Sequence, residues 1–249
     1  MTEFEKQFRE VQELLEFNDF NQTIKRVIDF TLDTENIDFY TKTNEFLNWL
    51  DHNEKEDEDK KTRLKTLLDE LHAFLSKKEC HNHQTIISVK NLQKVYNASF
   101  GLGPINLDIK TGEIIGLVGE NGNGKTTLLR SLCGELHPTS GTINYQFQYD
   151  DLYDLRTKLV YIPQRTDTWR GSMYENLEFT ASCYGYSPEE NNLVVDLVIT
   201  RLGLRKFRKH YWNNLSSGYK MRFELARMLL RKPKILLIDE PLANLDILA

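Results

Sequence analysis

One segment constrains the fold of this chain more than any other: Gly119–Thr127, which reads GENGNGKTT. It directly follows the apolar run IIGLV (114–118) and leads into TTLLRSLCGEL, a sequence typical of a helix. Glycines let the backbone curl so that successive N–H groups point at an anion, and the following helix adds the positive end of its dipole. A chance GxxxxGK[ST] match occurs in roughly one chain of this length in a hundred. The segment therefore predicts a strand, a phosphate-binding loop and a helix.

The residue types at the end of this loop indicate a nucleotide with a metal ion. Lys125 is expected to reach the β- and γ-phosphates, and the Thr126 hydroxyl to bind Mg²⁺. A tight turn without a ligand is the alternative, but it does not explain why Lys and Thr follow the last glycine. The expected nucleotide-binding residues of the loop are Gly119, Glu120, Asn121, Gly122, Asn123, Gly124, Lys125, Thr126 and Thr127.

A second acidic element lies about 110 residues downstream, in the segment ILLIDEP (235–241). An apolar strand that ends in two carboxylates suits a site that binds a metal and orients water. We expect Asp239 to support Mg²⁺ through its water shell, and Glu240 to polarise the attacking water. Together with the loop, this segment predicts nucleotide hydrolysis.

The first third of the chain has a different character. Residues 1–79 hold 20 of the 37 Asp/Glu and 12 of the 32 Lys/Arg, a net charge of −8, and all 13 Gly and 6 Pro lie beyond residue 100. Apolar residues recur there at helical spacing in four stretches, which predicts a four-helix bundle. We expect residues 1–84 to be an acidic helical domain with its linker, able to fold alone. The four stripes are Phe4, Phe8, Val11, Leu15; Ile24, Val27, Ile28; Phe39, Phe46, Leu47, Leu50; and Leu64, Leu67, Leu68, Leu71, Leu75.

From residue 85 onward, short apolar runs alternate with helix-forming stretches, which indicates an α/β domain over 85–249. Two smaller clusters have ordinary interpretations. Cys80, His81 and His83, with His72, could bind zinc but are better explained as a linker. The basic stretch RKFRKH (205–210) is better explained as a solvated helix end than as a binding patch.

Composition excludes several classes of protein. The net charge of −5 disfavours a protein that coats nucleic acid. Three scattered cysteines are too few for a disulfide framework, which favours a reducing, cytoplasmic compartment. No apolar run approaches the 18–20 residues, roughly, that span a bilayer, so any membrane-spanning part is expected to belong to another chain.

Taken together, these elements resemble the ATP-binding cassette (ABC) family, over essentially all of 86–249. YIPQ (161–164) is similar to the family's Q-loop, and LSSGYKMRFELARMLLRKPKILLIDEPLANLD (215–246) contains a signature segment, its helix, the second acidic motif and a D-loop in succession. The resemblance implies a P-loop NTPase cassette with a mixed sheet core, an antiparallel β subdomain and a helical subdomain, here with an N-terminal all-α bundle. It also places Tyr96 where cassettes carry an aromatic residue that stacks on adenine.

The resemblance further implies a mechanism. Two cassettes, as a homo- or heterodimer, clamp ATP and Mg²⁺ between the loop of one and the signature of the other, so Ser216 and Gly218 would complete the partner's site. Asn244 and Asp246 of the D-loop would lie at that interface. Gln164 would touch Mg²⁺ and take part in catalysis with Glu240. The chain would be the ATPase subunit of a transporter, held at the inner face of the membrane by an integral membrane subunit, with no nucleic acid partner.

The chain departs from the family pattern in two ways. The signature LSGGQ of the family reads LSSGY here, because Ser217 and Tyr219 replace a glycine and a glutamine. The H-loop histidine is absent, so we expect a C-terminally incomplete cassette, inactive alone, in which strands 114–118 and 235–238 lack their common neighbour and lie roughly 9–10 Å apart. A soluble cassette ATPase, and an ATP-binding interaction module with weak turnover, are the alternatives.

Overall fold

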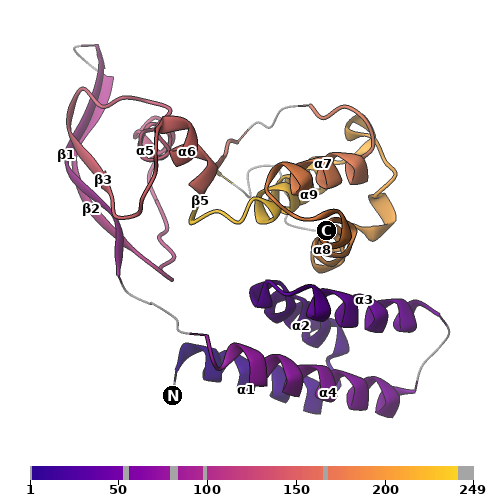
Figure 1. Ribbon diagram of the computed structural model, residues 1–249. Helices are drawn as coiled ribbons and strands as arrows, with labels where there is room; N and C mark the ends of the chain where they lie inside the picture. Colours follow the sequence, from indigo (N-terminus) through magenta and orange to yellow (C-terminus); the bar gives the residue numbers. More distant parts are fainter. Residues whose placement is uncertain (1, 53–55, 79–83, 98–99, 165–167, 241–249) are drawn as a thin grey trace. The chain divides into compact units, whose positions relative to one another are not determined.

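The computed structural model describes residues 2–52, 56–78, 84–97, 100–164 and 168–240 (Figure 1). The chain divides into two compact units. The helical unit comprises Met1–Glu79 and Thr168–Arg231, and the α/β unit comprises Cys80–Asp167 and Lys232–Ala249. Each unit is therefore assembled from two stretches that are distant in the sequence.

The four helices expected in the N-terminal third are present. Their apolar stripes face inward, as the helical spacing predicts. The Thr2 and Asp19 side chains accept hydrogen bonds from Glu5 N (3.2 Å) and Gln22 N (3.1 Å), and so cap the first two helices. The helices are α1 (Glu3–Glu16), α2 (Phe20–Thr34), α3 (Ile37–Asp51) and α4 (Asp57–Leu75).

The second stretch of the helical unit is also helical. Reciprocal hydrogen bonds between Ser172 and Glu175, and between Ser187 and Glu190, form capping boxes that define where its first two helices begin. The elements are α7 (Met173–Cys183), α8 (Pro188–Arg201), the 3-10 turns η1 (Arg205–Phe207) and η2 (Trp212–Asn214), and α9 (Ser217–Leu230).

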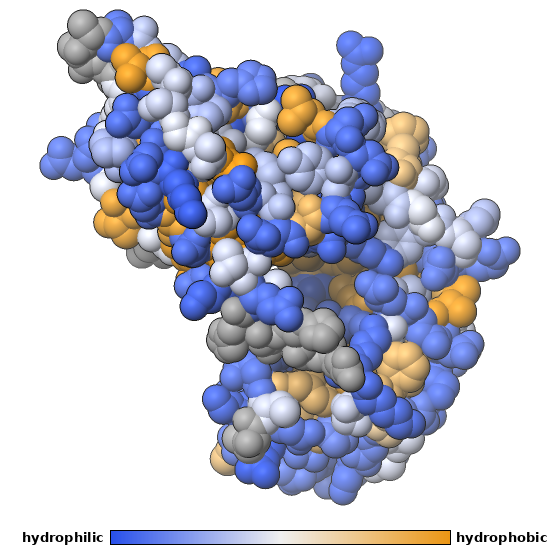
Figure 2. All heavy atoms as spheres, turned by 60° about the vertical axis from the view of Figure 1, so that its left-hand side comes forward, coloured by the Kyte–Doolittle hydropathy of each residue, from blue (hydrophilic) through white to orange (hydrophobic). Residues whose placement is uncertain are grey.

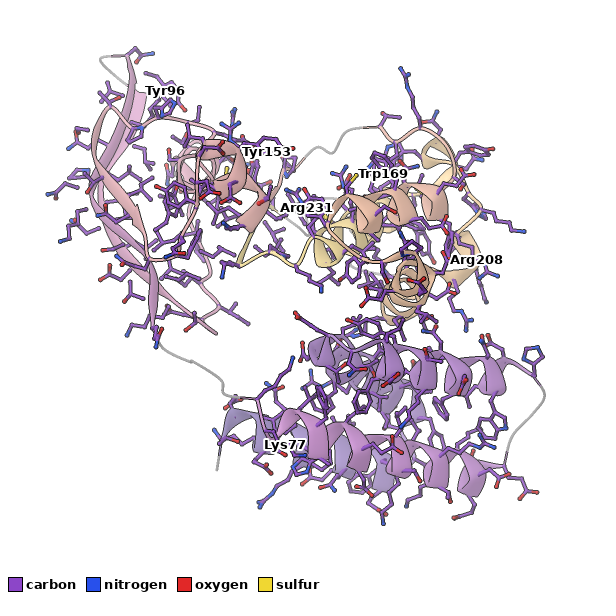
Figure 3. All side chains as sticks on the ribbon, in the orientation of Figure 1. Lys77, Tyr96, Tyr153, Trp169, Arg208 and Arg231 are labelled. Atoms are coloured by element: carbon purple, nitrogen blue, oxygen red, sulfur yellow. The ribbon has the colours of Figure 1, made fainter. Side chains whose placement is uncertain are left out.

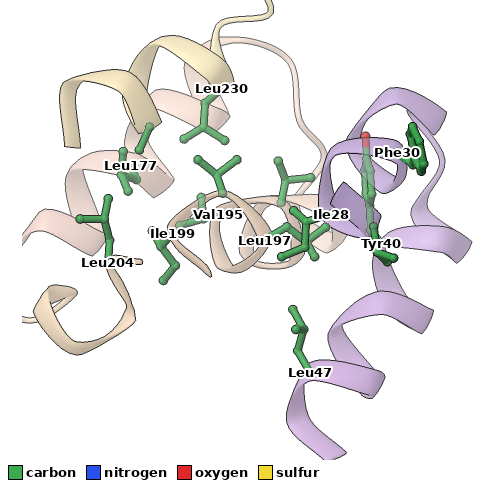
Figure 4. Close-up of a cluster of buried hydrophobic side chains, with 14 of the residues drawn as sticks. Ile28, Phe30, Tyr40, Leu47, Leu177, Val195, Leu197, Ile199, Leu204 and Leu230 are labelled. Carbon is green, nitrogen blue, oxygen red and sulfur yellow. The ribbon is translucent and has the colours of Figure 1, made fainter. Parts of the chain in front are cut away.

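One apolar core runs through both stretches of the helical unit. Helix α8 contacts α7 and α9, and also α2 and α3 (Figure 1). Ile28 and Leu47 of the bundle belong to the same buried cluster as Leu197 of α8 and Leu230 of α9 (Figure 4). The compact units therefore do not coincide with the division near residue 84 that composition suggests, because the bundle shares its core with residues 168–231.

A buried polar cluster joins the start of this second stretch to α9. Glu224 is 1% exposed and accepts a hydrogen bond from Trp169 Nε1 at 2.8 Å. Its other carboxylate oxygen pairs with Arg227 at 2.7 Å, and the Arg227 guanidinium lies over the Trp169 ring at 5.1 Å. Trp169 also stacks on Trp212. The carboxylate therefore accepts a hydrogen bond from the buried indole N–H and balances the charge of the partly exposed guanidinium.

Glu224→Ala is expected to lower the free energy of unfolding by about 2–4 kcal/mol, because it leaves the indole N–H and the guanidinium without their acceptor. Glu224→Gln keeps an acceptor for Trp169 and should cost less. Chemical denaturation measures both values. The control is Glu135→Ala, which breaks a more exposed pair with Arg130 and should change the value by no more than about 0.5 kcal/mol. Equal effects of Glu224→Ala and Glu135→Ala would contradict the prediction.

The described part of the α/β unit contains two small sheets. The first is antiparallel, with strand order β2-β1-β3, and the second pairs β4 and β5 in parallel. Helix α5 packs its Leu128 and Leu132 with Ile87 and Leu92 of β1 in one buried cluster. The elements are β1 (Thr85–Asn97), β2 (Phe100–Lys110), α5 (Lys125–Leu132), β3 (Ser140–Tyr145), α6 (Leu152–Lys158), β4 (Leu159–Ile162) and β5 (Ile235–Ile238).

The strand expected at 114–118 is not formed. These residues have no regular secondary structure, and Ile114 and Val118 are 98% and 99% exposed. In the described part of the chain, β5 pairs with β4 alone. A strand requires a neighbour to take its backbone hydrogen bonds, and segment 114–118 has none among the described strands. The prediction of a strand at 114–118 is therefore wrong. The segment also does not pair directly with β5.

Hydrophilic side chains predominate on the face shown in Figure 2. Among the described helices, none is both long enough and apolar enough to cross a membrane. The described residues also hold no group of three or more His, Cys, Asp or Glu side chains arranged to bind a metal ion. Cys80, His81 and His83 lie outside the described residues, so the zinc alternative stays untested.

Candidate nucleotide-binding site

The expected phosphate loop leads into α5 through two glycines with left-handed backbone. Gly122 has φ of 89° and Gly124 has φ of 83°, values that L side chains rarely adopt. A Cβ on Gly124 would lie 2.7 Å from the Leu102 side chain, so the position is also crowded. Gly124 caps α5 without a side-chain hydrogen bond, which leaves the first N–H groups of the helix free of a capping side chain. This is the arrangement that binds an anion.

Lys125 is the first residue of α5, and its side chain folds back over the loop. Its Nζ donates to the carbonyl oxygens of Gly119 at 2.7 Å and Glu120 at 3.0 Å. The loop is closed by a backbone hydrogen bond from Asn123 N to Glu120 O at 3.3 Å. The ammonium group is therefore held at the loop. A bound phosphate could replace the two carbonyl oxygens as the acceptor of its hydrogen bonds.

Thr126 and Asp239 meet although 113 positions separate them. The Thr126 hydroxyl donates to Asp239 Oδ2 at 2.7 Å, and the Tyr161 hydroxyl donates to the same oxygen at 3.0 Å. Asp239 is only 4% exposed. Burial, and then the hydrogen bond to Asp239, raise the pKa of Tyr161, so its proton stays available to the carboxylate. The start of α5 and the acidic residue that follows β5 are thus joined through Thr126 and Asp239, the two expected metal ligands.

Gln164 and Glu240 form a second pair in the same unit. Gln164 Nε2 donates to Glu240 Oε2 at 2.6 Å. Glu240 has φ of 46°, a left-handed value that is strained for a residue with a side chain and that often marks functional sites. The structure therefore brings together the residues expected to orient water and the Q-loop glutamine.

Tyr96 lies near the end of β1 and is exposed (Figure 3). Its hydroxyl lies 3.4 Å from Thr127 Oγ1 in α5, and Lys94 Nζ lies 5.7 Å from its ring centroid. The ring is therefore close to the phosphate loop and accessible for stacking, as expected of an adenine-binding aromatic residue.

The signature segment, Leu215–Tyr219, belongs to the helical unit, so its residues are grouped separately from the loop. Ser216 is the N-cap of α9, and its Oγ accepts from Tyr219 N at 3.5 Å. Gly218 lies in the first turn of this helix. Ser217 is the first residue of α9, a helical position that a side chain can occupy where the family pattern has glycine. Asn244 and Asp246 lie outside the described residues.

Two groups of interacting residues could not be found from local sequence patterns. Tyr161 was noted only as part of the YIPQ segment, yet it holds Asp239; its place in β4, parallel to β5 and in register with Leu237, was not visible from local patterns. In the helical unit, outside this site, the cluster of Trp169 and Glu224 was also missed. A glutamate on a helix otherwise lined with Met221, Phe223 and Ala226 was the one available signal.

The loop, the Thr126 hydroxyl at the start of α5 and the Asp239 carboxylate directly after β5 define a P-loop nucleotide-binding protein. The sequence profile described as "ABC transporter" matches residues 102–243, more than half of the chain. The chain belongs to this family, and the resemblance drawn from its motifs is confirmed.

Curated relatives and solved structures agree with this assignment. The Fe(3+) ions import ATP-binding protein FbpC of Vibrio cholerae is 33% identical over 171 residues, 66% of this chain and 47% of that protein. The methionine import ATP-binding protein MetN 1 of Acinetobacter baylyi is 37% identical over 172 residues, 64% of this chain and 48% of that protein. The structure of cbiO1 from Clostridium perfringens, part of the ABC transporter complex cbiONQ, has a TM-score of 0.58 and 31% identity and covers 65% of this chain and 68% of that chain. The chain spans about half the length of these two curated relatives.

Proposed function

We propose that this chain is the ATP-binding and ATP-hydrolysing subunit of an ABC transporter. The observation that carries the proposal is the contact between Thr126 and Asp239, 2.7 Å apart. It joins a phosphate loop to a second acidic motif, the two elements that nucleotide hydrolysis requires. The names of the relatives, which are ATP-binding proteins of transport systems, support the same activity.

The residues around this contact fit a magnesium ion. Mg²⁺ prefers oxygen ligands, and a hydroxyl, a buried carboxylate and the amide oxygen of Gln164 are available in one unit. When bound with ATP, the ion would neutralise charge on the β- and γ-phosphates. Thr126, Asp239 and Gln164 would hold it, Lys125 would bind the phosphates, and Glu240 would accept a proton from the attacking water.

The proposal includes two partners. A second cassette, identical or related, would receive Ser216, Gly218 and Asp246 at its nucleotide, so that ATP binding drives dimerisation. An integral membrane subunit would carry the transported substrate and hold this chain at the cytoplasmic face of the membrane. A multi-spanning membrane protein encoded beside this chain, and recovered with it from detergent-solubilised membranes, is the expected result.

A substitution of Tyr96 tests whether its ring stacks on the base of the nucleotide. Tyr96→Ala is expected to weaken ATP binding roughly 5- to 150-fold, because a base stacked on an aromatic ring is worth about 1–3 kcal/mol. Isothermal titration calorimetry measures the affinity for ATP and for GTP. Tyr153→Ala is the control, since Tyr153 is another exposed tyrosine of the same unit (Figure 3). Equal affinity of the Tyr96→Ala and Tyr153→Ala variants for ATP would remove Tyr96 from the site.

A further inference from the structure

The helical unit contains a direct route from the N-terminal bundle to the signature segment. Among the described residues, polar contacts join the bundle to α8 and η1. Asp29 pairs with Arg201 at 2.6 and 3.0 Å, and Asp51 pairs with Arg205 at 2.6 Å. Asn44 Nδ2, in a buried side chain, donates to Leu193 O at 3.1 Å. These contacts hold a specific orientation of the bundle in addition to the shared apolar core.

Asp51 is placed where a helix does not favour it. It is the last residue of α3, and a carboxylate at the C-terminal end of a helix is opposed by the helix dipole. Arg205 supplies the opposite charge from η1. The Asp51 side chain is 52% exposed and the Arg205 side chain 30%, so water partly screens the ion pair. The pair can therefore be broken without unfolding the unit.

The route continues from η1 to α9. Phe207, two residues after Arg205, packs against Tyr219 with ring centroids 4.0 Å apart. Arg222 lies over the Tyr219 ring at 5.4 Å. Tyr219 immediately follows Gly218, and its backbone N–H donates to the Ser216 hydroxyl. The basic stretch 205–210 is therefore not simply a solvated helix end, because Arg205 and Phe207 link two parts of the unit.

We propose that Tyr219 is a positioning residue through which the N-terminal bundle sets the backbone of Ser216 and Gly218. The contacts run from Asp51 to Arg205, from Phe207 to Tyr219, and from Tyr219 to the N-cap of α9. A glutamine, which the family pattern has at this position, could not make the aromatic contact. The inference rests on the proposed function, because Ser216 and Gly218 serve the nucleotide only in a cassette dimer. It gives the bundle a role as a regulator of the signature.

Hydrogen–deuterium exchange of the full chain tests the route without nucleotide. Asp51→Asn is expected to speed exchange of the backbone amides of 216–221 about two- to fivefold, as loss of a partly exposed ion pair allows. The control is Glu16→Gln, which removes the ion pair between Glu16 and Lys61, two residues of the bundle. This pair has the same 2.6 Å distance as the pair of Asp51 and Arg205, and its side chains are similarly exposed. Glu16→Gln should leave these amides unchanged. The exchanged pair Asp51→Arg with Arg205→Asp should restore slow exchange.

A double-mutant cycle separates coupling from general destabilisation. In a Tyr219→Gln background, Asp51→Asn should have no further effect on residues 216–221, because the link is already broken; in a Tyr219→Phe background the ring remains and the effect should persist. Additive effects in the Tyr219→Gln background, or unchanged exchange in Asp51→Asn alone, would overturn the proposal.

Nucleotide measurements then distinguish this inference from the proposed function. Asp51→Asn should leave ATP affinity for the phosphate loop unchanged and reduce kcat of the assembled ATPase about two- to fivefold. If the wild-type protein binds no ATP, the proposed function fails while the exchange cycle still reports on the route. If ATP binds and the exchange cycle is additive, only the route fails.

Discussion

Lys125→Ala is expected to reduce ATP affinity roughly 10- to 100-fold, because it removes a charged donor from phosphates in a partly desolvated loop. In the structure this ammonium group has only the carbonyl oxygens of Gly119 and Glu120 as its described hydrogen-bond acceptors. Its main contribution should therefore be to the ligand and not to the fold. Calorimetric titration with ATP measures the loss, and a thermal melt should show little change.

The control for this prediction is Arg130→Ala. Arg130 is a cation on the same helix, five residues further on, and it pairs with Glu135 at 3.0 Å. Its removal changes the charge of α5 by the same amount but takes no donor from the loop, so ATP affinity should change by less than about twofold. Unaltered affinity in Lys125→Ala would show that the loop does not bind phosphate.

Glu240→Gln should abolish most turnover while preserving nucleotide binding. The amide keeps the shape of the carboxylate and can accept a hydrogen bond from Gln164 Nε2, but it cannot accept the proton of the attacking water. In the assembled ATPase, turnover should fall about 10²- to 10⁴-fold, the usual contribution of a general base. With ATP and Mg²⁺ the variant should accumulate as a dimer in gel filtration, because bound ATP is no longer consumed.

Glu113→Gln provides the comparison for Glu240→Gln. Glu113 accepts a hydrogen bond from Lys110 N at 3.0 Å in a turn after β2. Among the described contacts, none joins Glu113 to Gln164 or Glu240. Turnover should be unchanged in this variant. A Glu240→Gln protein that remains monomeric and hydrolyses ATP at the wild-type rate is incompatible with the role assigned to Glu240.

Local patterns allowed several elements to be predicted before any coordinates. The helical spacing of residues such as Val11, Leu15 and Leu64 predicted α1–α4. The failure at 114–118 has a simple cause. An apolar run predicts a strand only where a neighbour can accept its hydrogen bonds, and local sequence does not specify that neighbour.

The candidate site divides in the same way. The phosphate loop and the pair of Asp239 and Glu240 could be assigned from residue types and spacing, because each motif is local, whereas Ser216 was implied by the family resemblance. Which of them meet could not. Thr126 reaches Asp239 across 113 positions, and Tyr161 reaches the same carboxylate across 78, through the parallel pairing of β4 with β5.

Glycines, charges and helical periodicity act within a few residues of one another, so the amino-acid sequence alone indicated a P-loop nucleotide-binding protein with an acidic helical segment before the cassette. The core that this segment shares with residues 168–231 became visible only in the folded chain. Arg201 pairs with Asp29 across 172 positions, and Glu224 holds Trp169 across 55. Such partners are selected in the folded chain, because apolar side chains gain free energy only where packing removes them from water, and that packing decides which polar groups come within reach of one another.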